Sequence, residues 1–552
     1  MSVDLQNDIN SQSVTQPLNR KIYRLGLLIF ILLFVGYIIV WSIISLDRFY
    51  SLHAGVLDLG INMYRGWVLY HNNWNLKTYL GYFAMSPFVF IFSPIMLLES
   101  YPLILIIQTI VLALPGIFLY MISRELKINP LYSAIIASLY LMYFPLAGIN
   151  YTDFHYQSFF ILFFVAGYFF QLRKKLMVSF IFFALASMVR FPYVAFVLIY
   201  AVVGLLVGRT DKSKVTDNSL LKFYFALAFF SVILLFFSYM TSYSSPQLVS
   251  SDLNGVSGGS VLIPKRVGLS LFTYFVILSP FLFSPLKQAK WLLLLLPSFL
   301  LTILSNYQGY LFLYYLNSQY GSSYVPFVLI SYVELISSIE NRKFSRHENR
   351  DQQFFFRKTQ VHCNLVKYIK KSVTSKRILI VSLVLLFAMN LYFQPLGPLN
   401  GHDNAGFYIY TNTGDFNPNL SQYYGLLDAI ALINEKDYNN TLIQDNMPEF
   451  LPRTVSSPGI LVTATGIFNG SISNQSIATN RFPVYFSNGW HNVSIDYVIA
   501  QPGNYFFYIG KPSVSQYYTA LLSSGYYGIL ADFNGTVVLE RGYKGPTIKL
   551  GV

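Results

Sequence analysis

Long apolar runs separated by short polar connections fill the chain up to about residue 395. The first run, Leu25 to about Ile44, is long enough to cross the roughly 30 Å hydrocarbon core of a bilayer. It follows the basic residues Arg20, Lys21 and Arg24, and no small-residue cleavage site comes after it, so it predicts a retained first helix. Ten further runs lie near 101–122, 131–149, 157–171, 176–189, 193–208, 220–240, 267–285, 291–304, 323–339 and 378–394. The pattern predicts about eleven transmembrane helices.

Basic residues occupy alternate loops between these runs. With a cytoplasmic N-terminus, every inner loop is basic, as the positive-inside rule requires. These loops are Arg124–Lys127, Arg173–Lys175, Arg209–Lys214, Lys287–Lys290 and 340–377. The last holds eleven Lys or Arg against three acids. We therefore expect a cytoplasmic tail (1–24), a transmembrane domain (25–395) with a first outer loop (46–100) and a basic cytoplasmic loop (340–377), and a multi-pass protein of the plasma membrane.

The apolar segment Ala84–Leu98 contains Pro87 and Pro94. If it crossed the membrane, every later loop would change sides and 340–377 would lie outside, against the charge rule. We interpret it as a helix that dips into the outer leaflet or packs on the bundle.

The region 396–552 differs from the rest in charge. It holds seven basic and ten acidic residues, a net charge of 7 − 10 = −3. It also carries six N-glycosylation sequons, at Asn419, Asn439, Asn469, Asn474, Asn492 and Asn534. An odd number of spans places this region outside, where sequons can be used. Chance in an Asn/Ser-rich segment is the weaker explanation, so we predict an extracellular, glycosylated domain.

The pattern within this domain is α/β. Leu420–Asn434 has helical periodicity, whereas Leu442–Gln444, Ile460–Ala464 and Tyr497–Ala500 have the character of strands. Near the end, the apolar stretches 527–533 and 536–540 flank Asn534-Gly535, a strong signal for a type I′ hairpin.

Composition supports a membrane protein. The chain is 54% hydrophobic and only 11% charged, far below the roughly 25% charge of soluble domains. The net charge of +14 reflects the basic inner loops, so we expect membrane lipids as partners and no nucleic acid. The single Cys363 excludes a disulfide framework. The sequence has no Walker, Gly-x-Ser-x-Gly or His-Glu-x-x-His motif, which argues against a nucleotide-driven pump, a serine hydrolase and a zinc protease.

Polar residues at the predicted outer face are the candidates for chemistry. Asp58 lies in the first outer loop, Asp153 and His155 follow the third span, Arg190 ends the fifth, and Tyr320 precedes the tenth. An arginine can hold a phosphate with fork geometry. A carboxylate can accept a proton or bind a divalent cation. Together they would suit a lipid-phosphate substrate.

Structural roles are open alternatives for each of these residues. Asp58 can cap a helix that starts near Leu59. His155 has no second histidine at ligand spacing, which favours a structural hydrogen bond over metal binding. Arg190 can extend its guanidinium to lipid headgroups.

The ordered set Asp58-Leu59-Gly60, Ser86-Pro87, Asp153-Phe154-His155, Arg190 and Gln319-Tyr320 resembles the membrane family called domain of unknown function 2079. The pieces Asp496-Tyr497-Val498, Tyr527-Gly528-Ile529 and Glu540-Arg541-Gly542-Tyr543 also look like that family's outer domain. The resemblance covers about 46 to 543.

That family is grouped with the GT-C superfamily of membrane glycosyltransferases, which use polyprenyl- or dolichyl-phosphate sugars. The resemblance implies that Asp58 is the catalytic or metal-orienting carboxylate, with Mg²⁺ or Mn²⁺ as the divalent cation. Two positions depart from the family pattern: Ala84 stands where a histidine is common, and Phe191-Pro192 where acids are common. These departures leave metal binding and activity open.

Two functions follow from these observations. The first is a GT-C-like glycosyltransferase at the outer face, with Asp58, Asp153 and His155 in catalysis and with Arg190 and Tyr320 at the substrate phosphate. The alternative is a non-catalytic scaffold or a transporter that displays the glycosylated domain. The sequons and the lack of disulfides fit an archaeal surface protein. The sequence does not indicate an oligomeric state.

Overall fold

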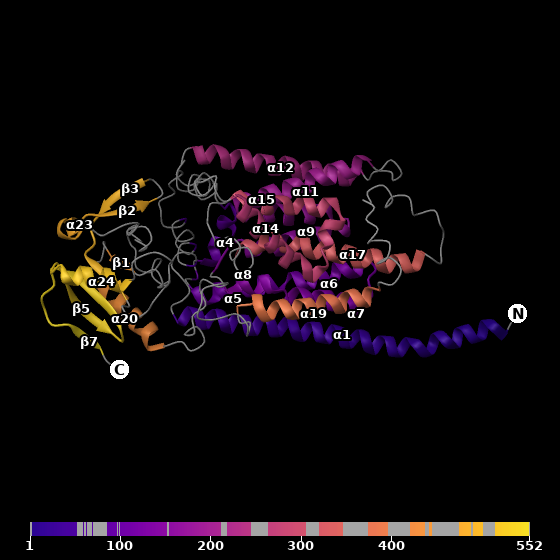
Figure 1. The fold of residues 1–552 in the computed structure, drawn as a ribbon, viewed down its shortest axis with the longest axis horizontal. Coiled ribbons are helices and arrows are strands. Elements are labelled where there is room, and N and C mark those ends of the chain that lie inside the picture. The colour runs from indigo at the N-terminus through magenta and orange to yellow at the C-terminus, as the bar shows by residue number, and fades with distance from the viewer. Residues whose placement is uncertain are drawn as a thin grey trace.

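The computed structural model describes residues 3–51, 59, 62, 69, 86–96, 98, 100–151, 154–210, 218–243, 263–304, 319–345, 374–395, 420–435, 441–443, 474–486, 489–500 and 514–550. Outside these residues lie Asp58, Asp153, the expected strand Ile460–Ala464 and three of the six sequon asparagines (Asn419, Asn439 and Asn469). A helical bundle makes up most of the described chain, and a small mixed sheet lies at one end of it (Figure 1). We call that end of the bundle the sheet end and the other the opposite end.

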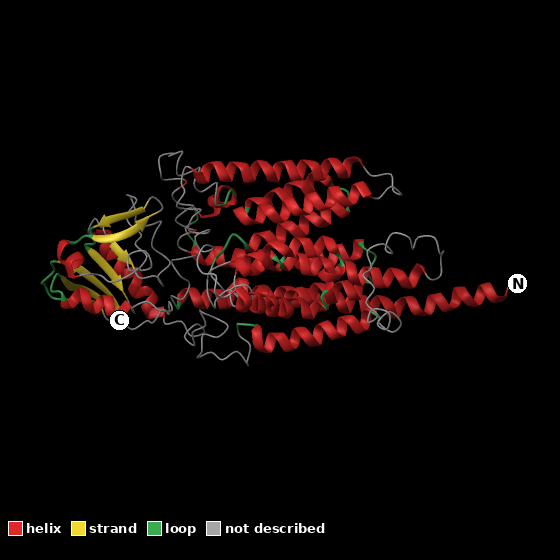
Figure 2. Cartoon of the chain, turned by 45° about the horizontal axis from the view of Figure 1, so that its top comes forward, coloured by secondary structure: helices red, strands yellow, loops and turns green. Residues whose placement is uncertain are grey.

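The bundle is built from helices that run roughly along one common direction (Figure 2). Their bounds are α1 (Val3–Tyr50), α4 (Phe88–Met96), α5 (Tyr101–Ala113), α6 (Pro115–Glu125), α7 (Pro130–Leu141), α8 (Phe144–Tyr151), α9 (Ser158–Leu172), α10 (Leu176–Met188), α11 (Phe191–Thr210), α12 (Asn218–Tyr243), α14 (Ile263–Leu278), α15 (Ala289–Leu304), α17 (Val325–Ser345) and α19 (Ser375–Phe393). Short 3₁₀ turns are η3 (Ser279–Phe281), η4 (Ser284–Lys287) and η5 (Gln319–Ser323).

Not all of these helices are long enough to cross a bilayer. In the described part of the chain, four helices are long and apolar enough: Arg24–Tyr50, Tyr101–Glu125, Asn218–Met240 and Ser375–Phe393. The pair α7 and α8, bent by 41°, makes a fifth if it counts as one broken span. Five of the predicted spans, those near 157–171, 176–189, 193–208, 267–285 and 291–304, correspond to shorter apolar helices. The predicted count of about eleven is therefore not confirmed.

Tight turns explain why several helices are short. Lys127 and Lys174 follow α6 and α9 in the left-handed conformation, with φ of 62° and 57°. The N–H of Lys175 then donates to the carbonyl of Phe170 at 2.9 Å, a C-terminal cap of the Schellman type. An ion pair between Arg173 and Glu125, 3.6 Å long, places both turns at the opposite end.

Burial separates the helices that face outward from those that form the core. In α1 and α12 only 22% of the apolar window is buried, against 56% in α5 and α6 together. The exposed side chains are large and apolar, for example Leu32, Phe225 and Phe236. Such surfaces suit contact with lipid and not with water.

Helix α4 is too short to span. Its nine residues extend about 14 Å at 1.5 Å per residue, and Pro94 lies inside it. It packs at the sheet end against the start of α9, where Phe88 and Phe92 contact Phe159 at centroid distances of 5.0 and 5.1 Å. This agrees with the interpretation of 84–98 as a segment packed on the bundle.

The sheet has the strand order β1-β4-β6-β5-β7. Its strands are β1 (Thr441–Ile443), β4 (Tyr497–Ala500), β5 (Tyr527–Phe533), β6 (Thr536–Arg541) and β7 (Ile548–Leu550). Phe533 pairs with Thr536 across Asn534 and Gly535, whose φ angles are 52° and 86°. Two positive φ angles are what a type I′ turn requires, so the predicted hairpin is confirmed.

Helix α20 (Leu420–Glu435) covers the sheet, and its range matches the predicted helix closely. It approaches β5 so closely that a Cβ on Gly425 would lie 2.2 Å from the carbonyl oxygen of Phe533. Leu426, Ala429 and Ile433 are buried between them. This region, which we call the sheet part, also contains two helices and a hairpin. These are α23 (Asn474–Thr479), α24 (Val514–Ser523) and the hairpin of β2 (Phe482–Phe486) with β3 (Gly489–Val493).

Candidate functional site

At the sheet end, Asn62 meets the segment Phe154-His155. Asn62 Nδ2 donates a buried hydrogen bond of 3.0 Å to the carbonyl of Phe154. The main-chain N–H of His155 donates to Oε1 of Gln108 at 2.8 Å, and its carbonyl accepts from Ser158 Oγ at 2.6 Å. His155 is only 3% exposed. Asn62, α5 and the start of α9 therefore hold the His155 segment in place.

A second group of polar residues continues along the end of α8. Thr109 Oγ1 on α5 donates to Asn150 Oδ1 at 3.1 Å. Arg48, in the last turn of α1, is 3% exposed and its guanidinium lies 4.1 Å from the centre of the Tyr151 ring. Burying a cation is costly unless its surroundings stabilise it, and an aromatic face is one such surrounding. The sheet end thus holds a buried positive charge next to the residues that precede Asp153.

The residues predicted to hold phosphate come together on the other side of this region. Ser86 Oγ donates to the carbonyl of Val189 at 2.5 Å, which ties the Ser-Pro pair to the residue before Arg190. Tyr193 on α11 and Ser322 on η5 share a buried hydrogen bond of 2.6 Å. Arg190 immediately precedes α11 and Tyr320 lies on η5, so this bond holds together the two segments that carry them. Segments about 130 positions apart in the sequence thus meet at one buried hydrogen bond.

The two groups lie beside each other. A Cβ on Gly321 would lie 3.2 Å from Cδ1 of Ile149, so η5 packs closely on α8 just before Asn150. We call the combined set the polar band, and define it as Arg48, Asn62, Gln108, Asn150, His155, Arg190, Tyr193, Tyr320 and Ser322. It collects polar side chains from α1, the first outer loop, α5, α8, α11 and η5 at the sheet end.

Asp58 and Asp153, the carboxylates of the predicted site, lie outside the described residues. Within the described ranges, no group of three His, Cys, Asp or Glu could hold a metal ion. Asn474, Asn492 and Asn534 lie at the start of α23, in β3 and in the β5–β6 turn, all in the sheet part. Glycosylation at these positions and a divalent cation remain predictions.

Sequence reasoning missed several members of the band. Gln108, with its neighbour Thr109 outside the band, is a polar residue inside the apolar run of α5, and polar groups in a membrane segment are a functional signal. Arg48 was recognisable as a charge just after an apolar run. Tyr193 and Ser322 gave no signal, because only the fold brings them together.

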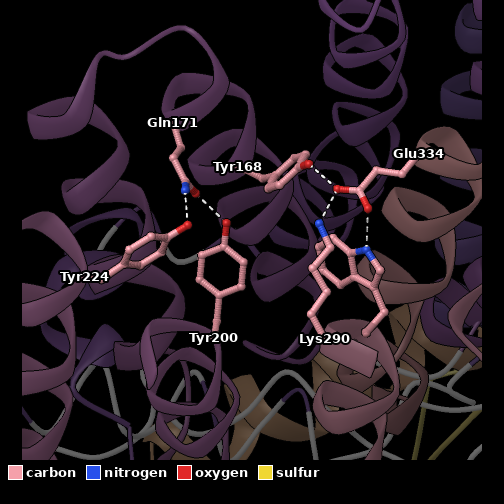
Figure 3. Close-up of polar contacts among 7 residues, drawn as sticks. Tyr168, Gln171, Tyr200, Tyr224, Lys290 and Glu334 are labelled. Carbon is pink, nitrogen blue, oxygen red and sulfur yellow. Dashed lines mark hydrogen bonds and ion pairs between the residues drawn. The ribbon is translucent and has the colours of Figure 1, made fainter. Parts of the chain in front are cut away.

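A separate polar network joins five helices nearer the opposite end (Figure 3). The carboxylate of Glu334 on α17 accepts bonds from Tyr168 at 2.5 Å, Lys290 at 2.6 Å and Trp291 at 2.8 Å. On α9, the amide of Gln171 donates to Tyr224 of α12 and accepts from Tyr200 of α11. The carboxylate has a donor at each oxygen, so these bonds hold the start of α15 against α9 and α17.

Residues 48–438 match the family described as "Predicted membrane protein (DUF2079)". The chain belongs to this family. This finding confirms the resemblance drawn from the sequence. The matched segment begins at Arg48 and contains the whole polar band. No curated protein matches this chain.

One solved structure similar to the chain is that of the oligosaccharyltransferase from Archaeoglobus fulgidus, tethered through a disulfide bond to an acceptor peptide with the sequence NVT. The TM-score is 0.42 and the identity 12%, over 93% of this chain and 74% of the oligosaccharyltransferase chain.

Proposed function

We propose that this member of the family is a glycosyltransferase that moves a sugar from a polyprenyl- or dolichyl-phosphate donor at the sheet end of the bundle. One observation carries the proposal: the buried Tyr193–Ser322 hydrogen bond joins the start of α11, next to Arg190, to η5, which carries Tyr320. A guanidinium and a phenol hydroxyl on two such neighbouring segments are suited to a phosphate ester. Because the bundle faces lipid on its outside, a lipid-linked phosphate can reach this position from the bilayer.

The reaction assigns one task to each group. The acceptor hydroxyl attacks the anomeric carbon of the donor while the bond from that carbon to the phosphate oxygen breaks. Asp58 takes the proton of the acceptor hydroxyl. Arg190 and Tyr320 hold the leaving phosphate, whose negative charge increases in the transition state. Asp153 orients His155, which contacts the same phosphate. In the alternative assignment Asp58 is the ligand of a divalent cation and not the base.

The proposed orientation places the sheet end outside the cell. The turns at the opposite end carry Arg124, Lys127, Arg173, Lys174 and Lys175, as the positive-inside rule expects of the cytoplasmic face. The sequons are concentrated in the sheet part. The donor lipid and the acceptor are then both outside, and the protein belongs in the plasma membrane.

Mass spectrometry of membrane glycolipids and glycoproteins, with and without the protein, tests the proposal. We expect a glycan that depends on the wild-type chain and is lost with Asp58→Asn. Arg190→Gln should reduce transfer about 100-fold, as loss of one charged phosphate contact does. Arg173→Gln, at the opposite end, is the matched control and should leave transfer unchanged. Normal transfer by Asp58→Asn at normal expression would rule out its assigned role, and absence of any dependent glycan would favour a scaffold.

A further inference from the structure

Tyr423 of α20 contacts the bundle. Its ring centre lies 5.1 Å from that of Tyr50, edge to face, and 5.8 Å from that of Phe49. Tyr423 is 9% exposed and Phe49 fully buried. Edge-to-face contacts of buried rings add to the stabilisation from burial alone. The sheet part is therefore anchored on the last turn of α1.

The same turn of α1 supplies Arg48 to the polar band. Consecutive helical residues point about 100° apart, so one turn can present side chains to two neighbours. Arg48 lies over Tyr151 of α8, and Phe49 also stacks on Tyr101 of α5, with 6.2 Å between ring centres. Phe49 makes the contact with α20, and the adjacent Arg48 carries the guanidinium. Both residues belong to one rigid turn, so the contact and the position of the guanidinium are linked.

Helix α20 is fixed to the sheet on its other face. Gly425 leaves no room for a side chain against β5, and Ala429 and Ile430 are buried. A displacement of the sheet therefore moves Tyr423, and through Phe49 and Tyr50 it moves the end of α1.

We propose that Tyr423 is a positioning residue for the polar band: by docking the sheet part on α1, it sets the place of Arg48 and so the affinity for the anionic group of the substrate. The choice of a lipid phosphate as that group rests on the proposed function. Arg48 supplies a buried positive charge at the Tyr151 side of the band. The sheet part then contributes to the affinity for the substrate and is not only a displayed domain.

The test uses the full-length protein in lipid nanodiscs and four variants. Tyr423→Ala removes the ring, Tyr423→Phe keeps it, and Tyr424→Ala is the matched control at the next position of α20, where the side chain is 57% exposed. Arg48→Gln removes the charge. The first measurement is hydrogen exchange of the amides of residues 46–51. We expect about fivefold faster exchange or more with Tyr423→Ala, and wild-type rates with Tyr423→Phe and Tyr424→Ala.

The second measurement is equilibrium binding of polyprenyl monophosphate. We expect Tyr423→Ala to raise Kd about five- to tenfold, the order that loss of one aromatic contact implies, with Tyr423→Phe and Tyr424→Ala close to wild type. In the Arg48→Gln background, adding Tyr423→Ala should change Kd no further, because the two residues act in series.

Each outcome decides one claim. Unchanged exchange with Tyr423→Ala, or equal effects of Tyr424→Ala, overturns the docking link. Faster exchange with an unchanged Kd, or additive effects of Tyr423→Ala and Arg48→Gln on Kd, overturns the positioning role. If the wild type does not bind polyprenyl monophosphate, the proposed function and the effect on affinity both fail, whereas the exchange rates still decide whether Tyr423 holds the end of α1.

Discussion

At the residue scale, Glu334 combines three hydrogen-bond donors with a largely buried position in the bundle. Its side chain is 15% exposed and that of Lys290 38%. Glu334→Ala leaves Lys290 without its counter-ion and takes the acceptor from Tyr168 and Trp291. Removal of one partner from a buried ion pair costs roughly 3–5 kcal/mol, so we expect about 2–3 kcal/mol for this partly exposed pair. Thermal unfolding in detergent micelles should show a clearly lower midpoint.

Glu125→Ala is the control for this prediction. It breaks the Arg173 ion pair at the same end of the bundle, whose side chains are 51% and 38% exposed. Exposed pairs contribute at most about 1 kcal/mol, so the midpoint should barely move. If Glu125→Ala lowered the midpoint as much as Glu334→Ala, the network of Figure 3 would contribute no more to stability than an exposed ion pair.

Tyr497 in the sheet part gives a prediction about pH. Burial, followed by the hydrogen bond to Glu540 and the charge of that carboxylate, raises the pKa of Tyr497 to about 12. A folded-state pKa above the unfolded value of 10.0 stabilises the fold below pH 10, and the contribution disappears as the pH rises from 10 to 12. Tyr497→Phe should therefore lose less stability over this range than the wild type. Hydrogen exchange of β4 and β6 measures it, with Tyr424→Phe as control.

The residues of the polar band show how far sequence reasoning reached. Arg190 and Tyr320 were selected as phosphate ligands because charges and hydroxyls at a membrane interface are informative, and the fold places their two segments side by side through the Tyr193–Ser322 bond; their role stays a prediction. Tyr193 and Ser322 were not identified, since each resembles any other interface residue until α11 and η5 are packed together. Arg48 was not identified as a member of the band, because its burial depends on Tyr151, which is more than 100 residues later in the sequence.

At the element scale, neighbouring residues in the sequence predicted some elements with their detailed geometry. For other elements they predicted the approximate place in the chain but not where the helix ends. The Asn534-Gly535 hairpin depends on two neighbouring residues and was predicted with its turn type. The run 267–285 was predicted as a span, yet α14 ends at Leu278 and the chain turns through Leu282 and Phe283, both with positive φ. No glycine or asparagine marks that turn. Tertiary contacts such as the bond from Tyr143 to the carbonyl of Ile277 hold it there.

The packing of α20 on the sheet gives a prediction at this scale. Gly425→Ala places a methyl group 2.2 Å from the carbonyl oxygen of Phe533, and a backbone atom in a paired strand cannot move aside cheaply. We expect a loss of about 2 kcal/mol or more and faster hydrogen exchange in β5 and β6. Gly36→Ala on α1, where a Cβ meets nothing within 4 Å, should be neutral or slightly stabilising. Equal behaviour of the two variants would contradict the close approach of α20.

At the scale of the whole molecule, the arrangement of the bundle makes the orientation testable. Glu125 and Arg173 meet at the opposite end, and the N-terminus extends from the same end (Figure 1). Because α4 does not span, residues before and after it in the sequence, such as Arg24 and Lys175, are expected on one side of the membrane. The positive-inside rule predicts that this side is cytoplasmic, and therefore that the sheet lies outside.

Labelling of single cysteines on intact cells measures this orientation. In a Cys363→Ser background, we expect a membrane-impermeant maleimide to label Ser523→Cys, an exposed position at the end of α24. Arg24→Cys and Lys175→Cys should react only after the cells are permeabilised. Different behaviour of Arg24→Cys and Lys175→Cys would mean that α4 and its flanking segments cross the membrane. Labelling of Lys175→Cys but not Ser523→Cys on intact cells would place the polar band on the cytoplasmic side, which contradicts a glycosyltransferase acting at the outer face.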